Sequence, residues 1–329
     1  TTSTINTKLL TVTAESQTKV YDAGTSVTSS ALGTGYSVVG LVGSESLAAV
    51  TLAYDSKDAG TRTITASNAV AGNDTLLSNY NVQYASNAVS SITPFIVSLD
   101  GGRVYNATRD VAAGVLTIGT LVNGEQLTLS GTGTLTGTKD VDDNKTFEIS
   151  TLALGNGTGL ASNYTLVGGA RAVDITRATI STVSGITATD KTYNATTAAA
   201  LVTSGATFNG MFSGDVLNVA ASAGVFSDAR AAIGKTVSIS GITLGGADAG
   251  NYNLTVGTGF MGEITPAPLT LTGFGTVTKV YDATVAAPLS AGSLSLSGVI
   301  SGDAVTADTS AVAATFDDKN VGSGKSLVV

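Results

Sequence analysis

The amino-acid sequence predicts an all-β protein, built as a tandem array of small domains. Three observations lead to this fold class: a motif that recurs at a nearly constant interval, apolar residues that alternate with polar ones, and the composition. The chain of 329 residues is rich in Gly, Thr, Ser, Ala and Val, and only 12% of its residues are charged. β-Branched side chains favour extended backbone, and Gly supplies turns with positive φ.

The recurring motif is a basic residue followed by Val or Thr, then Tyr, Asp or Asn, and Ala. Its four copies are Lys19–Ala23, Arg103–Ala107, Lys191–Ala195 and Lys279–Ala283. The tyrosines lie 84, 88 and 88 residues apart (105 − 21, 193 − 105 and 281 − 193). Self-similarity at such a period is the signature of a repeat architecture.

Other landmarks keep the same register as this motif. An Asn-Tyr pair occurs at 79–80, 163–164 and 251–252, and an Ile-Thr step follows at 92–93, 175–176 and 264–265. A turn of Gly and an acid recurs as Gly124-Glu125, Gly214-Asp215 and Gly302-Asp303, and is degraded to Gly43-Ser44-Glu45 in the first copy. Together these landmarks define repeats.

The landmarks place four β repeats at residues 1–94, 95–178, 179–266 and 267–329. The fourth is incomplete at its C-terminal end, because it lacks a counterpart of Ser240–Pro266, a stretch of 27 residues (266 − 240 + 1). The chain starts at Thr1 without a signal-peptide pattern, and we interpret it as a piece of a longer protein.

Within a repeat the hydrophobic period is two, as in strands with one face on a core. Val237 and Ile239 alternate with Ser238 and Ser240, and the segment 313–329 is typical of a hairpin with its turn at 320–324. Each repeat is therefore expected to be a small antiparallel β-sandwich or a β-grasp-like sheet, and the sequence leaves both open. The linker 264–268 holds two prolines, which restrict bending, so we expect the domains to form an elongated, semi-rigid rod.

The composition excludes several classes of protein. The chain has no His and no Cys, which removes the commonest general base, the thiolate nucleophile and the usual zinc ligands. A net charge of −8 argues against binding to nucleic acid, and no apolar run has the length of a membrane span. We therefore predict no enzyme, no catalytic, cofactor-binding or metal-binding residue, no cofactor, no nucleic-acid partner and no membrane insertion.

Three groups of residues allow a functional interpretation beside a structural one. The Tyr-Asp/Asn pair of the motif suits a sugar site, but a tyrosine packed at a strand end beside an Asx-turn is favoured. Acidic clusters at 140–144 and 317–320 could supply oxygen ligands to calcium, although solvated turns are favoured. Seven Asn-x-Thr sequons, at Asn73, Asn106, Asn144, Asn156, Asn163, Asn194 and Asn253, leave glycosylation open.

Taken together, the motif, the Ser-Gly-Asp turn, and the segments Ala247–Tyr252 and Phe316–Lys325 resemble the YDG-type repeat and its MBG-type relatives. Such repeats occur in filamentous-haemagglutinin-like exoproteins of Gram-negative bacteria. The resemblance implies two-partner secretion, display on the bacterial cell surface, and a structural stalk or spacer role in an adhesin for cell adhesion or biofilm formation. We expect the parent adhesin to contact a host or bacterial surface glycan or protein, and lateral self-association of neighbouring molecules is also open. The alternative is a glycan- or matrix-binding module within the repeats.

Overall fold

The computed structural model describes residues 1–221, 223–255, 257–289 and 294–329 and confirms the all-β fold class. No α-helix occurs among these residues, and none of their helical turns is long and apolar enough to span a bilayer. The chain forms two compact units, one of Thr1–Ala178 with Gly250–Tyr252 and one of Thr179–Ala249 with Asn253–Val329.

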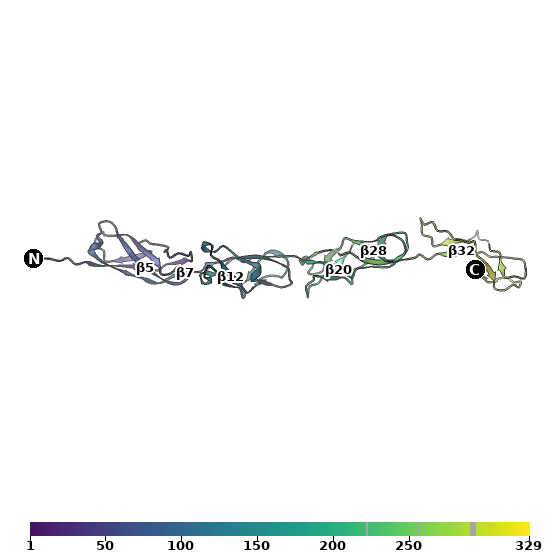
Figure 1. Cartoon of the computed structure of the whole chain (residues 1–329), viewed down its shortest axis with the longest axis horizontal. Helices are drawn as coiled ribbons and strands as arrows, with labels where there is room; N and C mark the ends of the chain where they lie inside the picture. Colours follow the sequence, from purple (N-terminus) through teal and green to yellow (C-terminus); the bar gives the residue numbers. More distant parts are fainter. Residues whose placement is uncertain (222, 256, 290–293) are drawn as a thin grey trace. The chain divides into compact units, whose positions relative to one another are not determined.

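The first repeat consists of two mixed sheets, with strand orders β3-β1-β6 and β2-β7-β5-β4. Burial alternates along β1, where Leu10, Val12 and Ala14 point into the core, as period-two patterning predicts. Figure 1 shows β5 and β7 side by side, where they pair antiparallel. The elements are β1 (Lys8–Ala14), β2 (Thr18–Val20), β3 (Tyr36–Val39), β4 (Leu47–Tyr54), β5 (Gly60–Ala71), η1 (Leu77–Asn79), β6 (Tyr80–Ala85) and β7 (Asn87–Thr93).

The second repeat follows the same plan with shorter strands. Its largest sheet has the order β11-β9-β18-β14, beside β10-β13-β15, β12-β16 and β17-β8. The elements are β8 (Phe95–Ile96), β9 (Leu99–Val104), β10 (Asp110–Ala112), η2 (Ala113–Val115), β11 (Leu116–Ile118), η3 (Val122–Gly124), β12 (Leu127–Ser130), β13 (Thr132–Leu135), β14 (Asp142–Lys145), β15 (Phe147–Glu148), β16 (Ala153–Asn156), η4 (Ala161–Asn163), β17 (Tyr164–Thr165) and β18 (Val173–Thr176).

The third repeat has a five-stranded sheet with the order β22-β31-β28-β27-β23 and four strand pairs, β19-β30, β20-β25, β21-β24 and β26-β29. Its elements are β19 (Ala178–Ile180), β20 (Thr182–Ser184), β21 (Thr187–Ala188), β22 (Lys191–Thr192), β23 (Ala198–Ala199), β24 (Leu201–Val202), β25 (Thr207–Asn209), β26 (Asn218–Ala220), β27 (Ala223–Phe226), β28 (Ala232–Ser240), β29 (Thr243–Gly245), η5 (Ala249–Asn251), β30 (Tyr252–Leu254) and β31 (Phe260–Thr265).

The fourth repeat is the smallest, with the pair β32-β34 and the sheet β33-β35-β36 among its described residues. The hairpin expected at 313–329 is confirmed, because β35 and β36 pair antiparallel. The elements are β32 (Thr270–Thr272), β33 (Ala286–Ala287), β34 (Ser295–Ser297), β35 (Ala314–Phe316) and β36 (Leu327–Val328).

One feature of the topology goes beyond the expected antiparallel pairing: the first and last strands of a repeat pair in parallel. This is the case for β1 with β6, β2 with β7, β9 with β18, and β22 with β31. The ladders β2–β7, β9–β18 and β22–β31 end at the Ile-Thr step, whose isoleucines Ile92, Ile175 and Ile264 are each 1% exposed. The ladder therefore brings the first motif and the last landmark of a repeat to the same end.

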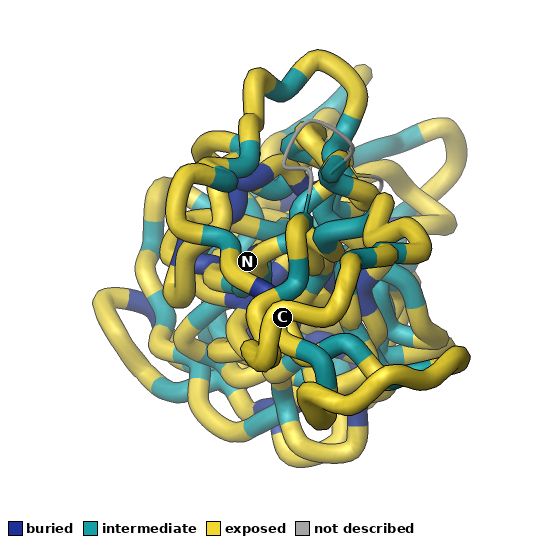
Figure 2. The backbone as a smooth tube through the Cα atoms, turned by 90° about the vertical axis from the view of Figure 1, so that its right-hand side faces the viewer, coloured by how far each residue is buried: buried dark blue, intermediate teal, exposed yellow. Residues whose placement is uncertain are grey.

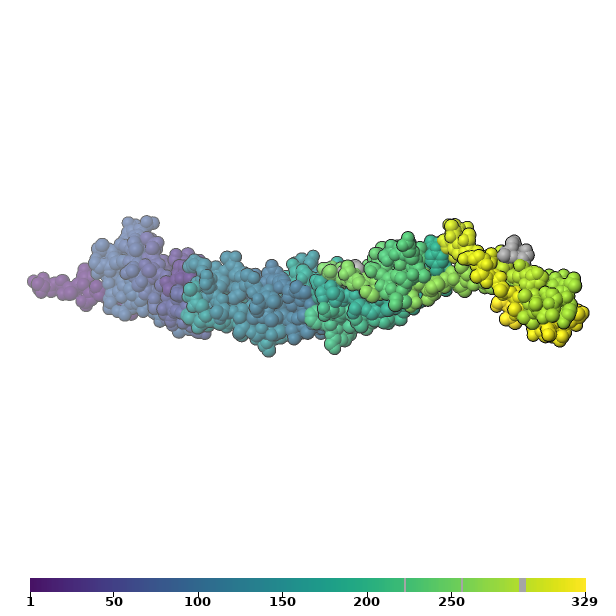
Figure 3. Space-filling model, turned by 45° about the vertical axis from the view of Figure 1, so that its right-hand side comes forward, coloured from purple at the N-terminus to yellow at the C-terminus, as the bar shows by residue number. Residues whose placement is uncertain are grey.

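The core is small and lies along the strands rather than in the loops. Figure 2 shows buried residues as short segments within a tube whose loops are exposed. In the space-filling view, the exposed residues 1–7 project from the first repeat (Figure 3).

Candidate functional site at the joint between repeats

The recurring motif forms a local turn that presents its tyrosine at the end of the repeat. The Tyr21 amide donates to the Thr93 carbonyl at 2.9 Å, and the Tyr105 and Tyr193 amides donate to the corresponding threonine carbonyls at 2.8 Å. After the tyrosine, Asp22 Oδ1 accepts from the Gly24 amide at 2.9 Å, which is the Asx-turn expected from the sequence. The alanine that follows has positive φ in all four copies, between 60° and 63°.

The basic residue that opens the motif closes this turn. Lys19 Nζ lies 2.7 Å from Asp22 Oδ1, and Arg103, Lys191 and Lys279 each bond the Asn or Asp in the same way. The Lys19 ammonium also lies 5.3 Å from the centroid of the Tyr54 ring, close enough for a cation–π contact. The hydrogen bond from Lys279 lowers the pKa of Asp282 to about 2. These contacts give the Tyr-Asp pair a structural role in the turn.

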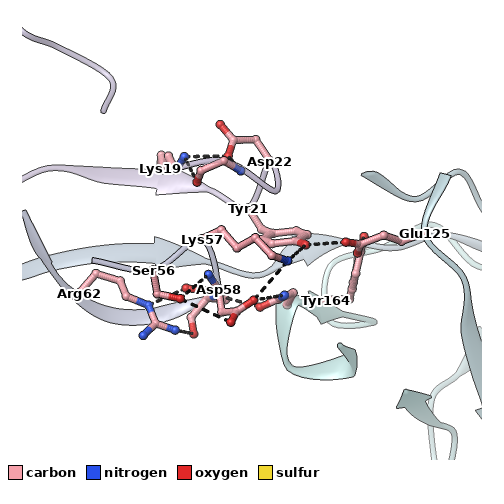
Figure 4. Close-up of polar contacts among 12 residues, drawn as sticks. Lys19, Tyr21, Asp22, Ser56, Lys57, Asp58, Arg62, Glu125 and Tyr164 are labelled. Atoms are coloured by element: carbon pink, nitrogen blue, oxygen red, sulfur yellow. Dashed lines mark hydrogen bonds and ion pairs between the residues drawn. The ribbon is translucent and has the colours of Figure 1, made fainter. Parts of the chain in front are cut away.

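At the joint between the first and second repeats, two tyrosines meet one carboxylate. The Tyr21 hydroxyl donates to Glu125 Oε1 at 2.8 Å, and the Tyr164 hydroxyl donates to Glu125 Oε2 at 2.6 Å. The two rings form an edge-to-face pair with centroids 5.4 Å apart. Figure 4 shows Tyr21 reaching from the first repeat toward Glu125, which lies beside Tyr164 on the second.

The electrostatics of this cluster keep both tyrosines neutral. Burial, followed by the hydrogen bond to Glu125, raises the pKa of Tyr21 and of Tyr164 above the ordinary value of 10.0. The Lys57 ammonium lies 3.4 Å from the Tyr21 hydroxyl, where its positive charge partly offsets the negative charge of Glu125. Tyr21 is 2% exposed, so a sugar could not stack on its ring in this arrangement.

A second contact lies beside the first and uses the asparagine of the Asn-Tyr pair. The Asn163 amide donates to Asp58 Oδ1 at 2.9 Å, while its carbonyl oxygen accepts from the Ala59 amide at 2.8 Å. Asn163 is fully buried, and the hydrogen bond that it donates lowers the pKa of Asp58. Both polar groups of the asparagine are thereby satisfied across the joint.

The same contacts recur farther along the first unit, which includes Asn251 and Tyr252 of the third repeat. The Asn251 amide donates to Asp140 Oδ1 at 2.9 Å, and its carbonyl oxygen accepts from the Val141 amide at 2.9 Å. Tyr105 and Tyr252 form an edge-to-face pair at 5.5 Å. The match with Asn163, Asp58 and the Tyr21–Tyr164 pair shows that the joint is a repeated structure.

In the second unit, the Tyr193 hydroxyl donates to Asp303 Oδ1 of the fourth repeat at 2.9 Å. Asp303 stands in the Gly-acid turn, as Glu125 does. By contrast, Tyr281 of the fourth repeat is 55% exposed, and Asn79 of the first repeat is exposed. Tyr193, which contacts the fourth repeat, is half-buried, whereas Tyr21 and Tyr105 are 2% and 1% exposed.

Most of the remaining candidate residues lie at the surface. Among the described residues, no group of three or more His, Cys, Asp or Glu side chains is placed to hold a metal ion. In the acidic clusters, Asp142 and Asp143 are exposed on β14, and Asp318 pairs with Lys325. Of the sequons, Asn163 is buried in the joint, whereas Asn106, Asn144 and Asn156 are exposed.

Sequence reasoning treated the Gly-acid turn only as a turn and missed its role at the joint. The signal was present, because the Tyr motif, the Gly-acid turn and the Asn-Tyr pair recur together in one register. The spacing of the repeats does not reveal that Tyr21 contacts the Gly-acid turn of the next repeat, 104 residues later.

The fold and the joint define a tandem β-repeat protein whose consecutive domains are linked by side-chain hydrogen bonds. The YDG domain family matches residues 6–88, 91–172, 176–259 and 265–329, and the chain therefore belongs to this family. No curated protein and no solved structure matches the chain significantly.

Proposed function

We propose that these repeats form a structural stalk or spacer within a large secreted bacterial surface adhesin, and that the parent protein acts in cell adhesion or biofilm formation. The observation that carries the proposal is the joint, in which Glu125 bonds Tyr21 and Tyr164 while Asn163 bonds Asp58. A spacer must keep consecutive domains from folding onto one another, and this joint supplies a fixed orientation.

Bending at this joint costs free energy. Each hydrogen bond to the charged Glu125 contributes about 1.5–3 kcal/mol, and an edge-to-face aromatic pair adds about 0.5–1.5 kcal/mol. The connection is also short, because β7 ends at Thr93 and β8 begins at Phe95 with only Pro94 between them. Proline restricts the backbone at that point. A hinge motion that separates Tyr21 from Glu125 thus has to break several contacts at once.

The secretion context of the proposal comes from the resemblance to filamentous-haemagglutinin-like exoproteins. On this basis the repeats lie on the bacterial cell surface after two-partner secretion and have no catalytic role. The parent adhesin contacts a host or bacterial surface glycan or protein, and the repeats hold the adhesive region away from the cell. Lateral self-association of neighbouring molecules is part of the same proposal.

Small-angle X-ray scattering of the chain tests the spacer. A compact globule of this length has a radius of gyration of about 20 Å, whereas four repeats in a row of roughly 120 Å give about 35 Å. We expect the larger value. The smaller value would mean that the repeats fold back on one another and would contradict the spacer role.

A glycan array separates the spacer from the alternative, a glycan- or matrix-binding module within the repeats. The chain is expected to bind no glycan, since the tyrosine of the first motif is engaged by Glu125. Saturable binding by the isolated chain would favour the binding module.

A further inference from the structure

The last strand of each of the first three repeats lies inside its sheet, next to an early strand of the same repeat. β7 lies between β2 and β5, β18 between β9 and β14, and β31 between β22 and β28. The pairing with the early strand is parallel in all three. To leave its sheet, the last strand must therefore break the ladders on both of its sides.

The two landmarks of the repeat, the Tyr motif and the Ile-Thr step, form this parallel ladder. Lys19 and Val20, which open the first motif, stand opposite Ile92 and Thr93. The second and third repeats pair the same positions. Just beyond the ladder, the Tyr21 amide donates to the Thr93 carbonyl at 2.9 Å. The recurring residues are therefore those that hold the first part of a repeat to its last part.

Tension along the backbone pulls the two strands of this ladder in opposite directions. The early strand is pulled from its N-terminal end and the last strand from its C-terminal end. Because the N-terminal ends of parallel strands lie on the same side, the two pulling points are at opposite ends of the ladder. The strands can separate only by sliding, and all hydrogen bonds of the ladder share the load. In an antiparallel hairpin pulled apart at its open end, the hydrogen bonds break one after another.

The ladder is also shielded and reinforced. The isoleucines of the Ile-Thr step are each 1% exposed, so the hydrogen bonds beside them lie in dry surroundings, where they are stronger than in water. The threonine that follows adds a side-chain bond across the ladder: Thr93 Oγ1 donates to the Lys19 carbonyl at 3.2 Å, and Thr265 Oγ1 to the Lys191 carbonyl at 3.4 Å. In the first repeat β1 and β6 form a second parallel ladder, and β8 with β17 forms one in the second repeat. A pull along the chain loads two ladders in these repeats.

We propose that these repeats are load-bearing modules, in which the parallel ladder of the Tyr motif and the Ile-Thr step is a clamp that resists tension along the chain. This function goes beyond the proposed spacer and rests on it only for the source of the load. The joint orients consecutive repeats, whereas the clamp keeps each repeat folded while the chain is pulled. An adhesin whose tip is held by a surface passes such tension through every repeat of its stalk.

Single-molecule force spectroscopy tests the clamp by comparing two directions of pulling. Handles at the two ends of the chain load each clamp along its strands. Handles at Ala49→Cys and Val70→Cys, two exposed partners near the open end of the β4–β5 hairpin, peel an edge strand from its sheet instead. The chain has no Cys of its own, so these handles attach only where they are placed.

At one loading rate, we expect the clamped repeats to unfold at a force at least about twofold higher than the force that opens the hairpin, because forced unfolding is governed by the unfolding rate, which falls when several bonds must break together. The ladder of β9 and β18 encloses residues 99–176, which are 78 residues (176 − 99 + 1) and extend to about 270 Å. Each end-to-end event should lengthen the chain by slightly less than this. Equal forces in the two directions, or a smooth extension without events, would overturn the proposal.

Variants of the first repeat locate the clamp. Ser91→Pro removes the amide that donates to the Gln17 carbonyl at 3.0 Å, and Ser90→Ala removes the hydroxyl that accepts from the Gln17 amide at 3.2 Å. Each should move one event per molecule to lower force, while the second and third repeats of the same molecule keep theirs. Ser67→Ala, on β5 away from the clamp, should move none.

If Ser91→Pro prevents folding of the first repeat, its event disappears and Ser90→Ala decides. An unchanged force in Ser90→Ala would then contradict the clamp. The spacer and the clamp fail separately, because a radius of gyration typical of an extended chain together with equal pulling forces would keep the spacer and reject the clamp.

Discussion

Glu125 accepts hydrogen bonds from two tyrosines that belong to different repeats, Tyr21 and Tyr164. Each of its carboxylate oxygens serves one hydroxyl, and both rings are at least 95% buried. Such a residue links two domains more firmly than a surface ion pair, because its partners have lost their access to water.

Replacing this carboxylate should destabilise the joint. In the variant Glu125→Ala two buried hydroxyls lose their acceptor, and each unsatisfied group costs about 1–3 kcal/mol. We expect the first transition in urea unfolding, followed by circular dichroism, to move to lower denaturant. The matched control is Glu148→Ala, at an exposed position of the same repeat, which should leave the midpoint unchanged. Equal effects of the two variants would argue against the role assigned to Glu125.

The alanine of the motif is a second position where a substitution should change stability. Ala107 has φ 60°, a left-handed conformation that costs an L-residue about 1–2 kcal/mol. Replacement by glycine removes this strain, while the freedom gained by the unfolded chain offsets about 0.4–1 kcal/mol. Ala107→Gly should therefore raise the melting temperature slightly.

Ala112→Gly, at an exposed strand residue with negative φ, is the control for this substitution. It should lower the melting temperature, because glycine weakens a strand. A fall in both variants would show that the left-handed turn carries no strain.

The joint should be stable across a broad pH range and weaken at both ends. The folded pKa of Asp58 is below the ordinary 3.8, so its contribution is present above that pH and is lost as pH falls through the folded value. Tyr21 and Tyr164 have a folded pKa above 10.0, so their contribution is present below pH 10.0 and is lost as pH rises through the folded value.

The contribution of Asp58 to stability can be measured from the melting temperatures of the native chain and of Asn163→Ala, taken from acid to alkaline pH. The hydrogen bond from Asn163 is the largest cause of the lowered pKa. The stability difference between the two proteins should therefore be constant near neutrality and shrink below pH 3.8. If the stability difference between the two proteins did not change with pH below 3.8, Asp58 would not contribute to the stability of the joint.

At the scale of the elements, the sequence predicted the strands well where they alternate and the repeats well where landmarks recur. Val237, flanked by serines, is buried in β28 as expected, and the hairpin of β35 and β36 is where the pattern put it. The repeat boundaries at 94, 178 and 266 stay a prediction.

The parallel pairing of first and last strands could not be predicted from local pattern. Lys191 pairs with Ile264, 73 residues later, and alternation along a strand is the same whether its neighbour is parallel or antiparallel. The joint was missed for a related reason, since turn chemistry explains Gly124-Glu125 fully without any partner. The position of Glu125 between two tyrosines is visible only in the folded structure.

The strands of the fourth repeat should open more readily than those of the third. Phe226 is buried under β31, whereas Phe316 is half-exposed, and local stability follows buried apolar contact. Hydrogen exchange read by mass spectrometry should show faster amide exchange in β35 than in β27. Equal protection in the two strands would mean that the burial of this phenylalanine contributes little to local stability.

For the whole molecule, the central claim is that the joint holds consecutive repeats in one orientation. The chain has no Cys, so spin labels can be attached at introduced cysteines without removing native ones. Thr65 on β5 and Thr117 on β11 are exposed residues of the first and second repeats. A control pair at Val39 and Thr65 lies wholly within the first repeat.

The measurement is the distribution of distances between the labels at Thr65→Cys and Thr117→Cys, taken by pulsed electron spin resonance. We predict one narrow distribution in the otherwise native chain, which broadens when Glu125→Ala and Asn163→Ala are added, while the control pair is unchanged. A broad distribution in the native chain, or a narrow one that ignores both substitutions, would contradict the joint as the element that fixes consecutive repeats.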